Sequence, residues 1–261
     1  MKYAADFRAI ARNALRGKWP TAVLTGFIAA LIGATIGTGG SSSVELPEAW
    51  QTNPVFQPII PLLLTLASFL TIYSIVVMVI GGAGKLGYAT FNLNLVDGKP
   101  AALSDLFSQF HRFGDGFCMN LLMGLYTALW ALLFIIPGIT KIYSYSMTPY
   151  ILAEHPEMSV NEAITESRRM MDGNKGRLFC LELSFIGWAL LIVLPLYLFI
   201  PLMLIGGAGA VLWLLLSVAS AIGGGLFLRP YTEAARAAFY RDVSGTEQAG
   251  TSTAEQAYDN F

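Results

Sequence analysis

The segment that decides the fold is I-P-G-I-T-K-I-Y-S-Y-S-M-T-P-Y-I-L-A-E-H-P-E-M-S-V-N-E-A-I-T-E-S-R-R-M-M-D-G (136–173). It joins a Pro-Gly pair, a short apolar stretch rich in hydroxyl groups, and a charged, well-capped helical pattern. It lies between long apolar runs. Whether its first half crosses a membrane therefore determines on which side the rest of the chain lies.

The composition indicates a membrane protein. Of the 261 residues, 55% are hydrophobic and 13% are charged, whereas soluble domains carry about 25% charged residues. The net charge of -1 gives no global field that would favour nucleic acid. Two distant cysteines and two distant histidines form no ligand cluster, so neither a metal nor a cofactor is predicted.

Five apolar runs approach or exceed the roughly 20 residues that are needed to span a bilayer. These runs are 20–36, 59–80, 117–136, 178–199 and 210–228. The Gly- and Ser-rich stretch 37–54 contains no Lys or Arg and is predicted to be an external loop.

The doubtful run is 139–153, which is short for a span and contains Lys141 and several hydroxyl groups. If it spans, 15 of the 16 basic residues lie inside and only Lys141 lies near the outer face. If it does not span, the basic residues divide eight and eight. The positive-inside rule therefore favours six spans with both termini cytoplasmic.

In the six-span arrangement Pro137 and Gly138 form the hairpin between spans three and four. Span four must be the central helix, shielded from lipid by its neighbours. Its hydroxyl groups, on Ser144, Ser146 and Thr148, would then bond to adjacent helices.

Amphipathic helices are predicted beside the spans. Residues 1–18 form an interfacial helix with arginines at four-residue spacing. Ser159 and Glu162 form a capping box for a cytoplasmic helix at 159–172, and Gly173 suits its C-terminal cap. A further helix follows Pro230, and the polar tail 244–261 is predicted to be disordered.

The candidate functional positions are polar groups in or near the spans: Glu182, Lys141, Ser144, Ser146, Thr148, Arg168, Arg169 and Arg229. A carboxylate within a membrane is a functional hypothesis by default. Glu182 lies only about one turn from the interface, however, so the favoured interpretation is that it snorkels to the interface or pairs with Arg177 or Arg229. Lys141 is expected to reach the headgroups, and Arg168 and Arg169 to be solvated or paired with Glu166.

Four strings of the sequence are distinctive: F-I-I-P-G-I-T-K-I-Y-S-Y-S-M-T-P-Y-I-L-A-E (134–154), N-E-A-I-T-E-S-R-R-M-M-D-G (161–173), L-F-C-L-E-L-S-F-I-G-W (178–188) and P-Y-T-E-A-A-R-A-A-F-Y (230–240). Through these strings the chain resembles the domain-of-unknown-function 975 family of bacterial integral membrane proteins. The stretch between the last two strings is longer than in many family members, which leaves the boundary between spans five and six open. The resemblance supplies no biochemical activity.

The sequence therefore predicts an all-α, six-span bundle of the bacterial cytoplasmic membrane, with amphipathic helices at its surface. The leading functional hypothesis is a non-enzymatic protein that acts through membrane lipids, a protein partner or a second copy of itself. The alternative is a transporter or channel for a small amphipathic or anionic solute. A membrane enzyme comes third, because no convergent set of acid, base or metal ligands is visible. No cargo can be named.

Overall fold

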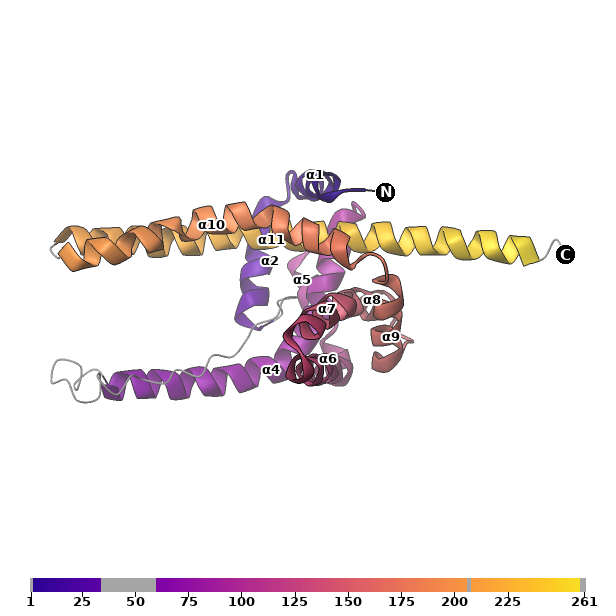
Figure 1. Ribbon diagram of the computed structural model, residues 1–261, viewed down its shortest axis with the longest axis horizontal. Coiled ribbons are helices and arrows are strands. Elements are labelled where there is room, and N and C mark those ends of the chain that lie inside the picture. The colour runs from indigo at the N-terminus through magenta and orange to yellow at the C-terminus, as the bar shows by residue number, and fades with distance from the viewer. Residues whose placement is uncertain (1, 34–59, 206–207, 259–261) are drawn as a thin grey trace.

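The computed structural model describes residues 2–33, 60–205 and 208–258, and all its regular elements are helices (Figure 1). The prediction of an all-α fold is confirmed. The helices are α1 (Ala4–Leu15), α2 (Trp19–Leu31), α4 (Ile60–Val96), α5 (Leu103–Phe107), the 3-10 helix η1 (Phe110–Arg112), α6 (Phe113–Leu133), α7 (Ile135–Tyr145), α8 (Thr148–Glu154), α9 (Val160–Met170), α10 (Lys175–Ile205) and α11 (Ala208–Tyr258). The predicted external loop 37–54 lies outside the described residues.

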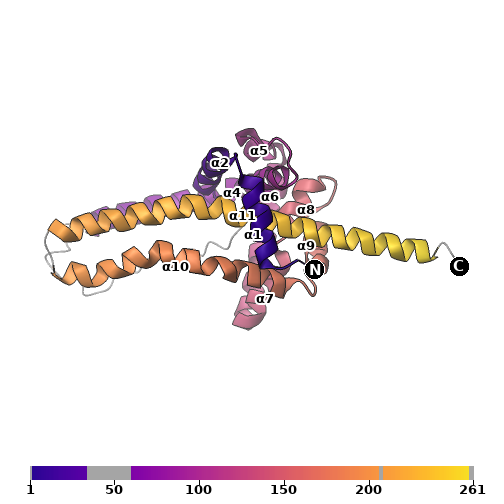
Figure 2. The ribbon, with the colours of Figure 1, turned by 90° about the horizontal axis from the view of Figure 1, so that it is seen from above.

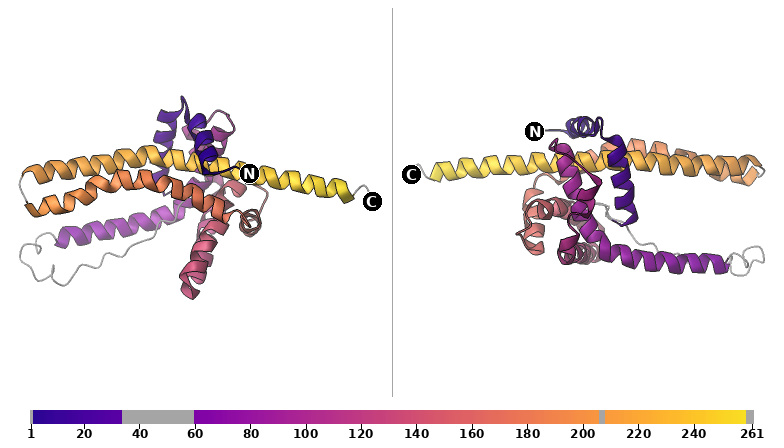
Figure 3. Two further views of the ribbon diagram at one scale, coloured as in Figure 1. Left: turned by 45° about the horizontal axis from the view of Figure 1, so that its top comes forward. Right: turned by 180° about the vertical axis from the view of Figure 1, so that it is seen from behind.

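One packed core holds the molecule together. It forms where α1, α5, α8 and α9 meet the C-terminal half of α4, the start of α10 and the middle of α11. Large side chains that are at most 1% exposed fill this core: Phe7, Leu86, Phe91, Tyr150, Phe239 and Tyr240. Away from the core, α10 and α11 run side by side as a long hairpin, whereas α7 projects in another direction (Figures 2 and 3).

The outer parts of the helices are apolar and exposed. Two stretches, Leu103–Leu133 and Lys175–Pro195, are long and apolar enough to cross a membrane, and only 11% and 17% of their apolar windows are buried. Leu132 is 82% exposed and Ile136 is 76% exposed. The core helix of a soluble protein would be mostly buried, so this exposure is weak evidence for membrane association.

The chain reverses at Phe134, which corrects the predicted hairpin at Pro137 and Gly138. Phe134 is extended and separates α6 from α7. Pro137 instead lies in the first turn of α7, where its missing N–H costs no helical hydrogen bond. Gly138 lets α7 approach α6 closely, because a Cβ there would lie 2.9 Å from the Ala131 backbone.

The predicted fourth span, 139–153, is not one helix. It is divided between α7 and α8, with a break at Ser146 and Met147. The hydroxyl group of Ser167 on α9 bridges this break: it donates to the Ser144 carbonyl at 2.9 Å and accepts from the Met147 N–H at 3.2 Å. A side chain distant in sequence thus satisfies backbone groups that the break leaves free.

Helix α4 continues through Gly81–Gly84, beyond the end of the predicted span at residue 80. Glycines allow α4 and α6 to cross with their backbones in contact. A Cβ on Gly82 would lie 2.1 Å from the carbonyl oxygen of Gly116, and one on Gly116 would lie 2.4 Å from the Ala83 nitrogen. Only residues without a Cβ fit this crossing.

Helix α1 uses its apolar face to pack on the protein. Phe7, Ala11 and Leu15 are at most 1% exposed, and the Phe7 ring contacts Phe239 of α11 edge-on at 5.3 Å. The apolar side of the predicted interfacial helix is thus covered by protein, and Arg12 and Arg16 stay on the exposed side.

Helix α11 continues through Pro230 instead of ending there. The buried proline packs near Gly26 of α2, where a Cβ would lie 3.7 Å from the Pro230 Cδ. The helix extends to Tyr258, across most of the segment 244–261 for which the sequence predicts disorder. Alanine, glutamate and glutamine, which favour helices, are frequent in that segment.

Candidate functional site

A cluster of charged side chains lies at the edge of the core, between α10 and α11. Arg236 of α11 donates from Nη2 to the Glu182 Oε1 of α10 at 2.7 Å. From Nη1 it donates to the Glu233 Oε1, one helical turn earlier, at 3.1 Å. Glu233 is 7% exposed. One guanidinium therefore serves two carboxylates, and we call these three residues the Arg236 cluster.

Two tyrosines extend the Arg236 cluster to other helices. The Tyr143 hydroxyl of α7 donates to the Glu182 Oε2 at 2.8 Å. The fully buried Tyr150 of α8 points its hydroxyl at the Glu233 Oε2, 3.5 Å away. The cluster consequently ties α7 and α8 to the α10–α11 pair.

Helix α4 adds polar groups beside the cluster. Tyr88 is 2% exposed, and its buried hydroxyl has no hydrogen-bond partner in the described part of the chain. Lys85, one turn earlier, donates from Nζ to the Asn120 Oδ1 of α6 at 2.9 Å. Both side chains interact electrostatically with Glu233.

Burial dominates the electrostatics of Glu233. It raises the pKa of that carboxyl above the ordinary 4.5, and the nearby charge of Glu182 raises it further, although Arg236 opposes the shift. For Arg236, burial disfavours the charged form, but Glu233 and Glu182 outweigh burial and raise the pKa. The guanidinium therefore stays charged, while the buried carboxyl resists ionisation.

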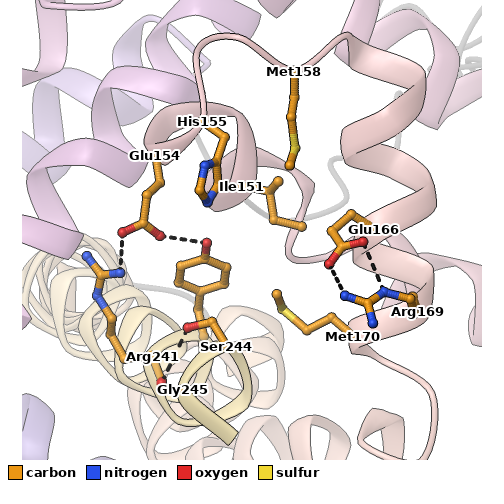
Figure 4. Close-up of a pocket in the computed structure, with 11 residues that line it drawn as sticks. Ile151, Glu154, His155, Met158, Glu166, Arg169, Met170, Arg241, Ser244 and Gly245 are labelled. Atoms are coloured by element: carbon orange, nitrogen blue, oxygen red, sulfur yellow. Dashed lines mark hydrogen bonds and ion pairs between the residues drawn. The ribbon is translucent and has the colours of Figure 1, made fainter. Parts of the chain in front are cut away.

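A surface cavity of about 320 Å³ lies between α8, α9 and α11 (Figure 4). None of the three residues of the Arg236 cluster lines it. Its centre is apolar and includes Ile151, Met158 and Met170. Ion pairs flank that centre on two sides, Glu154 with Arg241 and Glu166 with Arg169. His155 also lines the cavity, and its Nδ1 lies 3.1 Å from Glu157.

Arg241 joins the cavity to α4. It binds Asp97 through two nitrogens, at 2.8 and 2.7 Å, and also pairs with Glu154. Tyr240 donates to the same Glu154 at 2.8 Å. Burial disfavours ionisation of Asp97 and Glu154, but the hydrogen bonds from Arg241 outweigh it and hold both pKa values below their ordinary 3.8 and 4.5.

These two carboxylates are expected to make the core sensitive to acid. A lowered folded pKa contributes stability above the unfolded pKa, and that stability is lost as the pH falls through the folded pKa. We expect the melting temperature to drop below about pH 4, and Arg241→Gln to weaken this drop. Thermal melts across pH check the prediction, and an unchanged acid profile in Arg241→Gln would contradict it.

The position of Glu182 corrects its predicted pairing. Its partners are Arg236 and Tyr143, not Arg177 or Arg229. Arg177 instead binds Asp242 at 2.6 Å. Arg229 is exposed, and its carbonyl accepts from Thr232 at 2.8 Å.

Hydroxyl groups of the predicted fourth span are used mainly within their own helices. Ser144 donates to the Thr140 carbonyl at 2.9 Å, and Ser146 donates to the Tyr143 carbonyl at 2.7 Å. Thr148 is fully buried, and its hydroxyl finds no hydrogen-bond partner among the residues that the structure describes. These groups therefore do not form the interhelical hydrogen bonds that the sequence predicts for them.

The remaining candidates lie apart from the Arg236 cluster. Lys141 places its Nζ 4.6 Å from the centre of the Trp130 ring. Arg169 binds Glu166 through two nitrogens, at 3.0 and 2.6 Å, and Arg168 is exposed.

The helix caps are structural. Glu162 donates its N–H to the Ser159 hydroxyl at 3.4 Å, and the Ser159 N–H binds the Glu162 carboxylate at 2.8 Å. Gly173, with φ at +72°, ends the turn after α9 in a left-handed conformation.

Sequence reasoning missed Glu233 and Arg236 as site residues. It placed both in an amphipathic surface helix, whereas the structure buries Glu233 and leaves Arg236 only partly exposed. The sequence does contain one signal. Glu233 and Arg236 are three residues apart in the alanine-rich segment 230–240, so the two opposite charges lie on the same face of a helix.

The sequence matches one known protein family over most of its length. The model of the family described as "Protein of unknown function (DUF975)" matches residues 1–145 and 133–247. The chain belongs to the DUF975 family. No curated protein and no solved structure matches this DUF975 member. Within its described residues, no group of three His, Cys, Asp or Glu side chains is placed to hold a metal ion.

Proposed function

We propose that this DUF975 member is a six-span integral protein of the bacterial cytoplasmic membrane that acts through lipid or protein partners and not as an enzyme. One observation carries the proposal: apolar side chains are exposed along the outer parts of the helices, while charged groups gather around one packed core. A bilayer would cover this apolar surface, whose exposure to water would cost free energy.

The order of the helix ends supports six spans. The core contains Ala22 and Ala29 of α2, the end of α4, most of α8, the start of α10 and the middle of α11. A six-span chain with its N-terminus inside would bring the end of α4, the end of α8 and the start of α10 to the cytoplasmic face. Helix α6, with 21 residues, would be about 31 Å long and matches the hydrocarbon thickness.

The proposal requires the helices to align in the bilayer. The α10–α11 hairpin and α7 leave the core in different directions (Figure 2). In a six-span arrangement all of these helices would lie closer to parallel with the membrane normal. Phe134 and the break at Ser146 and Met147 are the positions at which the α6–α7 hairpin and α8 can reorient.

A transporter is the second candidate, because Glu182 lies in an apolar helix. Both of its carboxylate oxygens are already bound, by Arg236 and Tyr143. The cavity of Figure 4 is not lined by Glu182 or by residues 144–148. We therefore rank transport below a partner-binding role.

The cavity also includes His155 but neither Glu182 nor Arg229, so it gives no support to the enzyme hypothesis.

Topology can be tested by labelling single cysteines in a variant without Cys118 and Cys180. We expect a cysteine at Ile139 to react with an impermeant maleimide in intact cells, and one at Thr165 to react only after permeabilisation. Labelling of Thr165 from outside would contradict six spans. Extraction of the protein from membranes by alkaline carbonate would contradict membrane integration itself.

The partner-binding role needs a separate measurement. Affinity purification from native membranes, followed by identification of bound lipids and proteins, is expected to recover a specific lipid or protein. Stable monomers with unselective lipid, together with uptake of a solute by reconstituted vesicles, would favour the transporter instead.

A further inference from the structure

The Arg236 cluster contains one more acid than base. Glu182 takes the shorter contact with Arg236, 2.7 Å, and Glu233 takes the longer one, 3.1 Å. The Glu182 side chain is 31% exposed, whereas that of Glu233 is 10% exposed. The more exposed carboxylate therefore holds the guanidinium more closely, and the more buried one is left with the weaker interaction.

Among the residues that the structure describes, no second cation forms an ion pair with Glu233. Lys85 of α4 directs its ammonium group to Asn120, and Arg229 of α11 is exposed. The remaining titratable groups that face Glu233 are the hydroxyls of Tyr88 and Tyr150, with Glu182 beyond Arg236. Two carboxylates that share one cation in a buried site cannot both ionise easily.

We propose that the Glu233 carboxyl binds a proton in the folded protein at neutral pH, and that Glu182 is the ionised partner of Arg236. The Arg236 cluster is then a proton-binding site. The proposal concerns the packed core and does not depend on the number of spans.

The hydroxyl groups around Glu233 fit a protonated acid. A neutral carboxyl can donate its hydrogen as well as accept one. The Tyr150 hydroxyl lies 3.5 Å from the Glu233 Oε2, and the buried Tyr88 hydroxyl has no hydrogen-bond partner within the described residues. Burial raises the pKa of Glu233 and outweighs Arg236 and the hydrogen bond from Tyr150, which both lower it, in agreement with this assignment.

The bound proton would couple distant helices. When Glu233 loses it, two carboxylates compete for Arg236, and the contact between Arg236 and Glu182 weakens. Glu182 also holds Tyr143, which belongs to α7. The protonation of Glu233 therefore affects how firmly α7 is held to the α10–α11 pair.

Infrared spectroscopy of the purified full-length protein tests the proposal directly. The carbonyl stretch of a buried neutral carboxyl is separate from that of carboxylates. We expect such a band at neutral pH, its loss as the pH rises, and its absence in Glu233→Gln. In Glu182→Gln the band should also disappear, because Glu233 becomes the carboxylate that neutralises Arg236.

Stability measurements provide a second readout. A raised folded pKa contributes stability that is present at low pH and is lost as the pH rises through that pKa. Glu233→Gln resembles the neutral acid, so at neutral pH it should fold as well as the native protein and lose this part of the pH dependence. Glu182→Gln is the matched control, since it removes the other carboxylate of the same arginine.

Two outcomes would overturn the proposal. The first is a native spectrum without a carboxyl band that depends on Glu233. The second is a Glu233→Gln variant that is much less stable than the native protein at neutral pH, since this would identify Glu233 as an ionised partner of Arg236. If Glu233→Gln does not fold, the carboxyl band of the native protein and its loss in Glu182→Gln still test the proposal.

Discussion

Replacing Arg236 with alanine is expected to lower the free energy of unfolding by about 1.5–3 kcal/mol, because it removes charge-assisted hydrogen bonds from two carboxyl groups. Arg236 neutralises Glu182 at 2.7 Å and binds Glu233 at 3.1 Å. Its loss would remove the cation that binds Glu182 and the shorter of the two hydrogen bonds to Glu233. The alkyl part of the side chain would leave a gap as well.

This loss can be measured by denaturant or thermal unfolding in one detergent. Arg169→Ala is the control, because Arg169 forms an exposed ion pair with Glu166 that should contribute less than about 1 kcal/mol. Adding Glu182→Gln to Arg236→Ala should recover part of the stability, since it removes the unpaired carboxylate. Equal effects of Arg236→Ala and Arg169→Ala would show that the cluster is not buried as described.

The crossing of α4 and α6 predicts a second large effect. Gly116→Ala is expected to destabilise the protein at the upper end of the about 1–3 kcal/mol that overpacking costs. The added Cβ would lie 2.4 Å from the backbone nitrogen of Ala83, and backbone cannot rotate aside as a side chain can. The two helices would have to separate.

Gly124→Ala is the matched control on the same helix. Nothing lies within 4 Å of a Cβ at Gly124, and alanine in a helix is favoured over glycine by about 1 kcal/mol. The control should therefore keep or raise the melting temperature, while Gly116→Ala lowers it. If both variants melt alike, the close crossing of α4 and α6 is wrong.

The helical fold could largely be predicted from sequence because its signals are local. Apolar runs of sufficient length predict helices whatever surrounds them. Ser159 and Glu162, which cap the start of α9, lie three residues apart, and Gly173 follows shortly after the end of the same helix. Both ends of α9 could therefore be predicted from neighbouring residues alone. The family could also be recognised, because four strings occur in the same order along one chain.

Breaks within and between the helices could not be placed in the same way. Pro137 and Pro230 both suggest an interruption, yet Pro137 lies in the first turn of α7 and Pro230 inside α11. The real breaks are at Phe134 and at Ser146 and Met147. Their freed backbone groups depend on partners such as Ser167, and no local pattern announces such a partner.

The sequence by itself determined the all-α class, the position of most helices and the family, because periodicity, capping and apolar length act over a few residues. Tertiary structure alone decided which charges meet. Glu182 and Arg236 are 54 residues apart, and they join only because α10 folds back along α11. An ion pair between two helices depends on how those helices pack, and that packing is set by the whole core rather than by either segment.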